Sequence, residues 1–184
     1  MKQLFILLAT VSFAFQVNAQ IFKAKDNSTE ISFFSSSPLE DITAVNKGAV
    51  IVMNSANGDI QIRITNTNFK FKNSLMEEHF NENYMESQKF PNSIFKGKVN
   101  EKVNYEVDGE NKVTISGKLE IHGVTKDVTL DGVIQVKGKE LSISSKFKVK
   151  VADYNIKVPS LYVKNIAEVV DVSLSSVLEP FQKK

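Results

Sequence analysis

Two histidines, His79 and His122, are the side chains in this sequence best suited to acid–base or metal chemistry. Neither lies at metal-ligand spacing from another ligand, and the chain contains no cysteine. His79 has Glu77, Glu78 and Glu82 close by in sequence, and on a helix this cluster is typical of a solvated polar face. We therefore expect no metal centre and no cofactor.

Motifs for nucleophilic catalysis and phosphate binding are also missing from the chain. It has no G-x-S-x-G nucleophile elbow and no glycine-rich phosphate loop. Residues 108–111 read DGEN, which is acidic but too short for a calcium loop and is typical of a turn. We expect no catalytic residues and no enzyme activity, with a site assembled from distant residues as the open alternative.

Charge and composition argue against a nucleic-acid partner. The chain has 23 basic and 21 acidic side chains, and Arg63 is the single arginine. Nucleic-acid binders usually carry a large basic excess and favour arginine for its bidentate geometry. Because cysteine is absent, stability must come from burial of apolar side chains and not from disulfides.

The first residues are typical of an export signal. Lys2 gives a positive start, residues 4–15 are almost wholly apolar, and Val17 and Ala19 suit the positions that a signal peptidase reads. The apolar run is shorter than the roughly 20 residues of a membrane-spanning helix. We predict a signal peptide over residues 1–19 and a single mature domain over 20–184, periplasmic or secreted, with a transmembrane anchor as the weaker alternative.

The elements that must position any site are strands, because the dominant hydrophobic period after residue 20 is two. Residues 113–121 alternate apolar and polar side chains, as do residues 128–136 and 141–151. The odd residues of the first run and the even residues of the second should face one common interior. Strands are predicted near residues 30–35, 47–54, 59–72, 93–107, 112–122, 126–137, 140–152 and 168–178.

Turn signals between these runs indicate antiparallel neighbours. Asn57-Gly58 and Asp108-Gly109 are hairpin signals, and Gly123 and Gly138 mark two further turns. Several predicted strands are long, which suits a closed, strongly twisted barrel better than a small sandwich. The fold class is therefore all-β, an antiparallel barrel of about eight strands.

One segment, residues 74–89, breaks the period of two and predicts a helix. Ser74 and Glu77 form a capping-box pattern, and Pro91 prevents continuation. Met76, Phe80 and Tyr84 fall on one helix face. This helix could cover one end of the barrel, either as plain core packing or as a lid that touches a ligand.

Residues 117–130 read GKLEIHGVTKDVTL, which resembles the G-x-L-x-I-H-G-V-T-K-x-V-x-L signature of the YceI-like family, the polyisoprenoid-binding periplasmic proteins. Residues 79–95 are similar to the helix and following strand of that family, and residues 147–156 match its penultimate strand loosely. The resemblance covers residues 70–175 well and residues 21–69 poorly. It implies an extended, lipocalin-like barrel with a long apolar interior that holds an isoprenoid or another long-chain lipid.

The sequence also departs from the family pattern in its N-terminal half. Residues 33–41 lack both the early-strand histidine and the G-x-F-x-x-F-x-G pattern that the family often has. The usual arginine before the Asp-aromatic pair is absent as well, and Lys150 is the nearest base. These departures bear on the identity of the ligand more than on the fold.

The leading hypothesis is a binding or carrier protein that holds a long-chain apolar ligand inside the barrel. The alternatives are a secreted structural or adhesion barrel without a ligand and an enzyme with a site in the barrel mouth. His122, at a strand end before Gly123, is expected to bond the turn backbone or to face the polar head of the ligand. The predicted ligand-binding residues are Phe69, Phe71, Met76, Phe80, Tyr84, Phe95, Leu119, Ile121, His122 and Phe147.

The signal peptide can be tested directly. Protein recovered from its native host should begin at Gln20, because cleavage is predicted after Ala19. N-terminal sequencing or intact mass measures this, and a mature chain that still carries Met1 would contradict the prediction.

Overall fold

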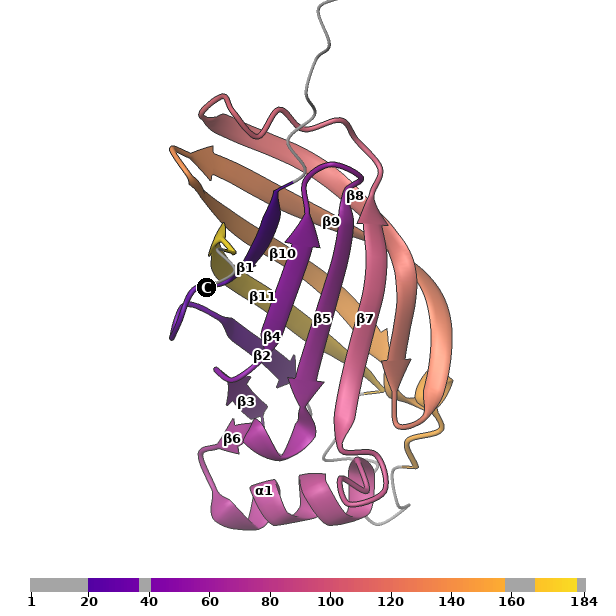
Figure 1. Cartoon of the computed structure of the whole chain (residues 1–184). Coiled ribbons are helices and arrows are strands. Elements are labelled where there is room, and N and C mark those ends of the chain that lie inside the picture. Colours follow the sequence, from indigo (N-terminus) through magenta and orange to yellow (C-terminus); the bar gives the residue numbers. More distant parts are fainter. Residues whose placement is uncertain (1–19, 37–40, 158–167, 182–184) are drawn as a thin grey trace, which may run out of the picture.

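The computed structural model describes residues 20–36, 41–157 and 168–181, and most of them lie in β-strands (Figure 1). The predicted signal peptide, residues 1–19, lies outside the described residues. The described strands are β1 (Ile21–Ala24), β2 (Glu30–Ser35), β3 (Ile42–Asn46), β4 (Val50–Asn54), β5 (Asp59–Thr65), β6 (Lys70–Phe71), β7 (Asn92–Val99), β8 (Gly109–Ile121), β9 (Val124–Lys137), β10 (Glu140–Lys150) and β11 (Val169–Pro180).

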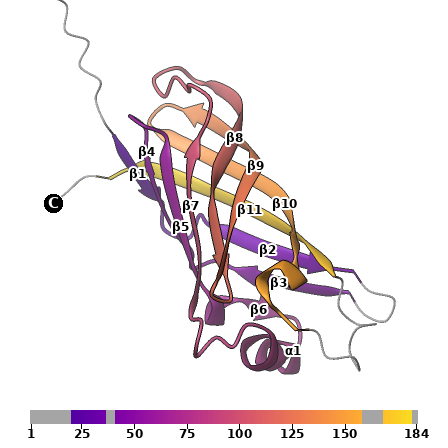
Figure 2. The ribbon, with the colours of Figure 1, turned by 90° about the vertical axis from the view of Figure 1, so that its right-hand side faces the viewer.

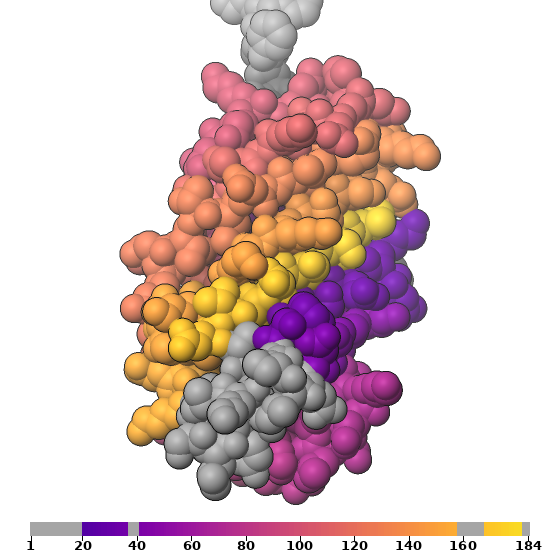
Figure 3. Space-filling model, turned by 180° about the vertical axis from the view of Figure 1, so that it is seen from behind, coloured from indigo at the N-terminus to yellow at the C-terminus, as the bar shows by residue number. Residues whose placement is uncertain are grey.

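Eight of these strands close into an antiparallel ring. Their order is β1-β4-β5-β7-β8-β9-β10-β11, and β11 pairs back onto β1. Seen from behind, yellow β11 lies between the orange strands and the indigo-to-violet N-terminal strands (Figure 3). The closed ring confirms the predicted all-β, lipocalin-like barrel of about eight strands.

The other three strands continue the ring toward one end of the barrel. Along β11, Phe22 of β1 pairs with Pro180 and Phe34 of β2 pairs with Asp171, so β1 and β2 lie end to end on the same edge. β3 pairs with β2 and β6, while β4 pairs with β1 and β5. Three stretches of chain therefore each act as one long strand that is broken in the middle (Figure 2). They are β1 with β2, β3 with β4, and β5 with β6.

Fully buried asparagines stabilise two of these breaks. Between β3 and β4, the side chain of Asn46 donates to the Thr65 carbonyl at 2.9 Å and accepts from the Gly48 N–H at 2.9 Å. Between β5 and β6, Asn66 begins the 3₁₀ turn η1 (Asn66–Asn68) and donates to the Phe90 carbonyl at 2.7 Å. Each amide replaces ladder hydrogen bonds that the broken strands cannot make, which removes the cost of burying unpaired polar groups.

Several predicted strand boundaries were wrong, and these breaks explain most of them. The predicted strand 59–72 is split by η1, and the predicted strand 47–54 begins only at Val50. β1 and β3 were not predicted. The predicted strand 93–107 ends at Val99, and Gly109 opens β8 instead of forming a tight hairpin with Asp108.

The long hairpin of β8 and β9 has the predicted register. Ile115 pairs with Leu130 and Val113 pairs with Gly132, so the odd residues of β8 and the even residues of β9 share one face. That face packs into the hydrophobic core. The predicted common interior is therefore confirmed.

A glycine pair lets β7 and β8 approach closely inside this barrel. Gly97 pairs directly with Gly117. A Cβ atom on Gly117 would lie 2.4 Å from the Lys96 carbonyl oxygen and 2.5 Å from the Gly97 Cα, and the Phe95 ring occupies the space over Gly97. The two strands therefore approach closely at a position where no side chain fits.

The predicted helix is present but shorter than predicted, as α1 (Ser74–His79) followed by one π-helical turn, η2 (Phe80–Tyr84). Its N-cap is Asn73, whose side chain accepts from the Leu75 N–H, so the predicted capping box at Ser74 is wrong. Glu77 instead contacts Lys70. The helix ends because Glu86 adopts a left-handed conformation, with φ of 42°. Figure 1 shows the helix across one end of the barrel.

The glycine pair generates a stability prediction. Gly117→Ala should lower the free energy of unfolding by about 1–3 kcal/mol, because the added methyl group meets backbone atoms that cannot move aside. Urea denaturation measures the change. Gly109→Ala is the matched control, since nothing lies within 4 Å of its Cβ position. Equal midpoints for the two variants would contradict the role of the pair.

Candidate ligand-binding site

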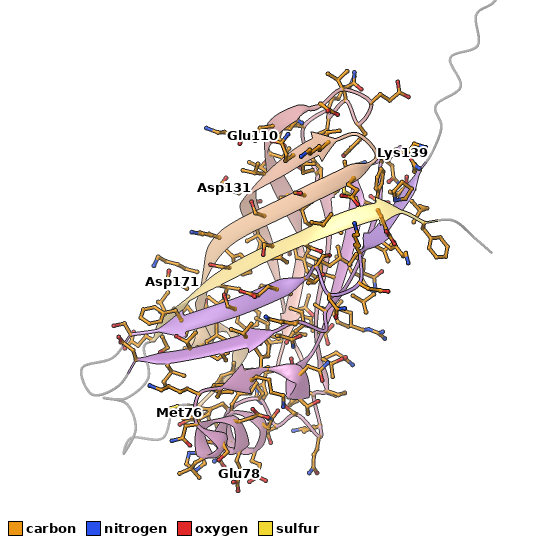
Figure 4. The ribbon with its side chains drawn as sticks, turned by 90° about the vertical axis from the view of Figure 1, so that its left-hand side faces the viewer. Met76, Glu78, Glu110, Asp131, Lys139 and Asp171 are labelled. Carbon is orange, nitrogen blue, oxygen red and sulfur yellow. The ribbon has the colours of Figure 1, made fainter. Side chains whose placement is uncertain are left out.

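The barrel contains a cavity of about 350 Å³ at the end covered by the helix. Its walls come from β2, β8, β10 and β11, and its floor comes from α1, η2 and the turn η1. Figure 4 shows Met76 on the barrel side of the helix and Glu78 on the opposite side. We call residues 74–90, which run from the start of α1 to the start of β7, the lid.

Eight of the ten predicted ligand-binding residues meet at this cavity. They come from segments that are far apart in the sequence, and the closed ring brings them together. They are Phe69, Phe71, Met76, Phe80, Tyr84, Leu119, Ile121 and Phe147.

Phe95 lines a second cavity of about 80 Å³ that lies deeper in the barrel. The two cavities have five wall residues in common, which makes them neighbouring parts of one apolar interior. The shared residues are Ile31, Ile64, Leu119, Phe147 and Val172. From Ile121 to Val113, this interior follows β8 for about 26 Å of strand.

Four phenylalanine rings join the lid to the barrel wall. The Phe80 ring of the lid lies 5.1 Å from Phe71, 5.5 Å from Phe69 and 5.6 Å from Phe33, measured between ring centroids. Such aromatic pairs stabilise by about 0.5–1.5 kcal/mol each beyond the area that they bury. The cluster therefore fixes one side of the lid and forms part of the cavity surface.

Polar side chains in the cavity gather at the lid end. Ser35, Asn66 and Ser93 are buried there, and the lid region adds Asn73, His79 and Tyr84. The Ser93 hydroxyl donates to the Asn66 side chain at 2.9 Å. Among the described lining residues there is no Lys, Arg, Asp or Glu. The lid end can therefore form hydrogen bonds to a ligand without contributing a permanent charge.

His79 departs from the predicted solvated face. Glu78 and Glu82 are exposed as predicted, but His79 is half-buried and lines the cavity. It lies three residues after Met76 on the helix, so both side chains point to the same side. The three-residue spacing from Met76 was the sequence signal that could have placed His79 at the cavity.

His122 lines neither cavity. Its Nδ1 lies 3.2 Å from the Tyr154 carbonyl oxygen and its Nε2 lies 2.8 Å from the Glu86 carboxylate. Its ring also packs on Phe90, with 4.5 Å between centroids. His122 thus bonds a backbone carbonyl, though one in the 3₁₀ turn η3 (Val151–Tyr154) and not in its own hairpin turn.

A family model described as the YceI-like domain matches residues 11–178. The chain belongs to the YceI-like family. Its fold is similar to a polyisoprenoid-binding domain from Saccharophagus degradans, with a TM-score of 0.75, 15% identity, and coverage of 87% of this chain and 98% of that one. It is also similar to BcnA of Burkholderia cenocepacia, with a TM-score of 0.71, 17% identity, and coverage of 84% and 98%.

A third similar structure is the YceI protein of Campylobacter jejuni, with a TM-score of 0.54, 19% identity and full coverage of both chains. The comparison with curated proteins finds no match. Among the residues described for this YceI-like chain, no helix is long and apolar enough to cross a membrane.

The sequence also missed some cavity residues of this YceI-like barrel. Ile31, Phe33 and Ser35 alternate along β2, while Val170 and Val172 do so along β11. Their period of two marked one face of each strand as buried. The pattern could not say whether that face met the cavity or solid packing.

Two tyrosines with a raised pKa lie outside the cavity lining. Burial raises the pKa of Tyr105 to about 12, and Tyr105 packs against Phe22, with 6.4 Å between ring centroids. Burial, with a smaller effect of the Asp153 charge, raises the pKa of Tyr154.

In the described ranges, no group of three His, Cys, Asp or Glu side chains could hold a metal ion.

The cavity generates a ligand-exclusion prediction. Ile121→Trp should weaken binding of the neutral apolar probe N-phenyl-1-naphthylamine at least tenfold, about 1.4 kcal/mol, because the indole fills the space that the probe needs. Fluorescence titration measures the affinity, and circular dichroism checks that the sheet persists. Lys118→Trp, on the exposed face of the same strand, is the matched control. Equal affinities in both variants would contradict the cavity as the binding site.

Proposed function

We propose that this protein is a binding or carrier protein that encloses one long-chain apolar ligand, an isoprenoid or another lipid, inside its barrel. The observation that carries the proposal is the apolar interior formed by two neighbouring cavities that share five wall residues. Its volume falls within the range of about 300–1,000 Å³ that is usual for small-molecule sites. A barrel with only a structural role would fill this space with side chains.

The distribution of polar groups supports an orientation for the ligand. The deeper cavity is almost wholly apolar, whereas Asn66, His79 and Tyr84 belong to the part nearest the lid. We propose that the chain of the ligand lies deep in the barrel and that its polar end lies under the lid. Because the described lining carries no Lys or Arg, an uncharged polar end fits better than a phosphate.

Energetics are consistent with retention of such a ligand. Burial of ten methylene groups at about 0.8 kcal/mol each contributes about 8 kcal/mol before costs. Loss of translational and rotational freedom on association offsets several kcal/mol of this gain. A longer chain, or a hydrogen bond at the polar end, is therefore required for tight binding.

A binding role is also favoured over catalysis. His79 is the one histidine in the described cavity lining, which contains no Lys, Arg, Asp or Glu, so the lining offers few groups for acid–base catalysis. The family resemblance points in the same direction, since the Saccharophagus relative is described as a polyisoprenoid-binding domain.

Export from the cytoplasm is the second part of the proposal. It depends on the predicted signal peptide over residues 1–19, with the mature domain over 20–184. A carrier outside the cytoplasm would shield an apolar chain from water between membranes or between a membrane and an enzyme.

Lipid analysis tests the proposal directly. Organic extracts of protein purified without detergent from its native host should contain a long-chain lipid by mass spectrometry. The lipid should be depleted in Ile121→Trp and retained in Lys118→Trp. Extracts of the wild-type protein that contain no lipid above a blank purification would overturn the proposed ligand.

A further inference from the structure

The contacts of His122 tie together three segments that border the cavity. His122 begins the two-residue turn between β8 and β9, with φ of 51°, and Glu86 follows the lid helix, with φ of 42°. Tyr154, whose carbonyl oxygen accepts from the same ring, ends η3. Each segment also supplies cavity residues, namely Ile121, Met85 and Val151.

Both hydrogen-bond partners of the imidazole are acceptors. A backbone carbonyl oxygen only accepts, so Nδ1 must carry a proton to bond Tyr154. An ionised carboxylate also only accepts, so Nε2 must carry a second proton to bond Glu86 at 2.8 Å. If the Glu86 carboxyl group holds that proton instead, the number of protons shared by the two side chains is the same. The arrangement therefore contains one proton more than a neutral imidazole and a carboxylate together.

The imidazole of this pair is shielded from water, whereas the Glu86 side chain is 46% exposed. The His122 side chain is 11% exposed, and the Phe90 ring packs against it. Phe90 also contacts Gly123, where a Cβ atom would lie 2.5 Å from the ring. Packing therefore holds the imidazole in one place, facing the Glu86 carboxylate.

Other charged side chains occur on the surrounding elements. Lys89 of the lid lies over the Phe90 ring, 4.9 Å from its centroid, and Asp153 precedes Tyr154 in η3. Glu120 and Lys126 flank the β8–β9 turn. Within the described part of the chain, Glu86 is the charged group that is hydrogen-bonded to the ring.

We propose that the His122–Glu86 pair is a proton-dependent latch that holds the lid over the ligand cavity. When the extra proton is present, both hydrogen bonds form and ligand exchange is slow. When it is lost, the neutral ring has one proton for two acceptors, so either the Glu86 or the Tyr154 contact loses its hydrogen bond and the lid opens more often. Histidine is the side chain that ordinarily changes charge between about pH 5 and pH 8, so release should quicken as the pH rises through that range.

The other attachments of the lid do not depend on this proton. Phe80 packs in the four-ring cluster, and Asn66 donates its side-chain amide to the Phe90 carbonyl and its backbone N–H to the Pro91 carbonyl. The latch therefore acts on the segment around residues 84–90, while the aromatic cluster keeps the start of the lid in place.

The latch rests on the proposed function of the cavity, and its test measures release of N-phenyl-1-naphthylamine into phosphatidylcholine vesicles. We expect the rate constant of the wild-type protein to be about fivefold higher at pH 8.5 than at pH 5.5. Glu86→Gln should be slow at both values, because the amide can accept from a protonated Nε2 and can donate to an unprotonated one. His122→Asn, which tolerates the positive φ, should be fast at both.

His79→Asn is the matched control for the other histidine. It changes the cavity lining and hence the absolute rate, but it should keep the wild-type ratio between the two pH values. Equal wild-type rates at both pH values would overturn the latch. So would a Glu86→Gln variant with the wild-type ratio, or a His79→Asn variant that loses it.

Hydrogen exchange of the ligand-free protein tests the latch even if no probe binds. The amides of Met85, Ser87 and Phe90 donate to the Phe80, Asn81 and Glu86 carbonyls. Their protection, corrected for the intrinsic effect of pH, should fall between pH 5.5 and pH 8.5 in the wild type and stay constant in Glu86→Gln. Constant wild-type protection would overturn the latch, whereas failure to bind probe or lipid would overturn only the proposed function.

Discussion

The barrel depends on the edge of β11 that pairs with both β1 and β2. Without that pairing the sheet would be open, and the edges of β11 and β1 would expose unpaired backbone groups. Between β1 and β2 the chain does not pair with β11 as a strand, and side-chain hydrogen bonds maintain its contact with β11 there. The Ser28 hydroxyl donates to the Val177 carbonyl at 2.9 Å, and Thr29 bonds Ser176 at 2.8 Å.

This closure leaves the barrel with two different ends. Away from the lid, strands are continuous and the core is packed by residues such as Met53, Val136 and Leu178, which are fully buried. Near the lid, three strands are broken, and described strand β6 pairs with β3 alone. Asn66 spans the resulting gap through hydrogen bonds to the Phe90 and Pro91 segments. The cavity therefore lies at the end of the barrel where regular strand pairing is interrupted.

The lid is attached by two kinds of interaction that respond differently to conditions. The phenylalanine cluster around Phe80 is apolar and insensitive to protonation. The two hydrogen bonds of His122, to Glu86 and to Tyr154, together need a proton on each ring nitrogen, and they lie at the opposite end of the lid. In the proposed latch, the helix stays docked at its start while its end opens, which would give a ligand a route to the cavity without unfolding the barrel.

The sequence by itself determined the features that depend on local spacing. The period of two in residues 113–136 fixed the register of β8 and β9, because a slip of one residue would turn every apolar side chain outward. The positive-φ turns at Gly58, Gly123 and Gly138 and the apolar face of residues 76–84 are equally local. The signature at residues 117–130 identified the family for the same reason.

Only the tertiary structure decided the features that depend on contacts between distant segments. The breaks at Asn46 and Asn66 are invisible in the strand pattern, since an asparagine there is favourable only with a carbonyl of another segment in reach. Ring closure decided that Phe71, Phe80 and Phe147 surround a space and do not fill one. The partners of His122 lie 32 and 36 residues away in the chain, so its role depends on geometry that no local spacing encodes.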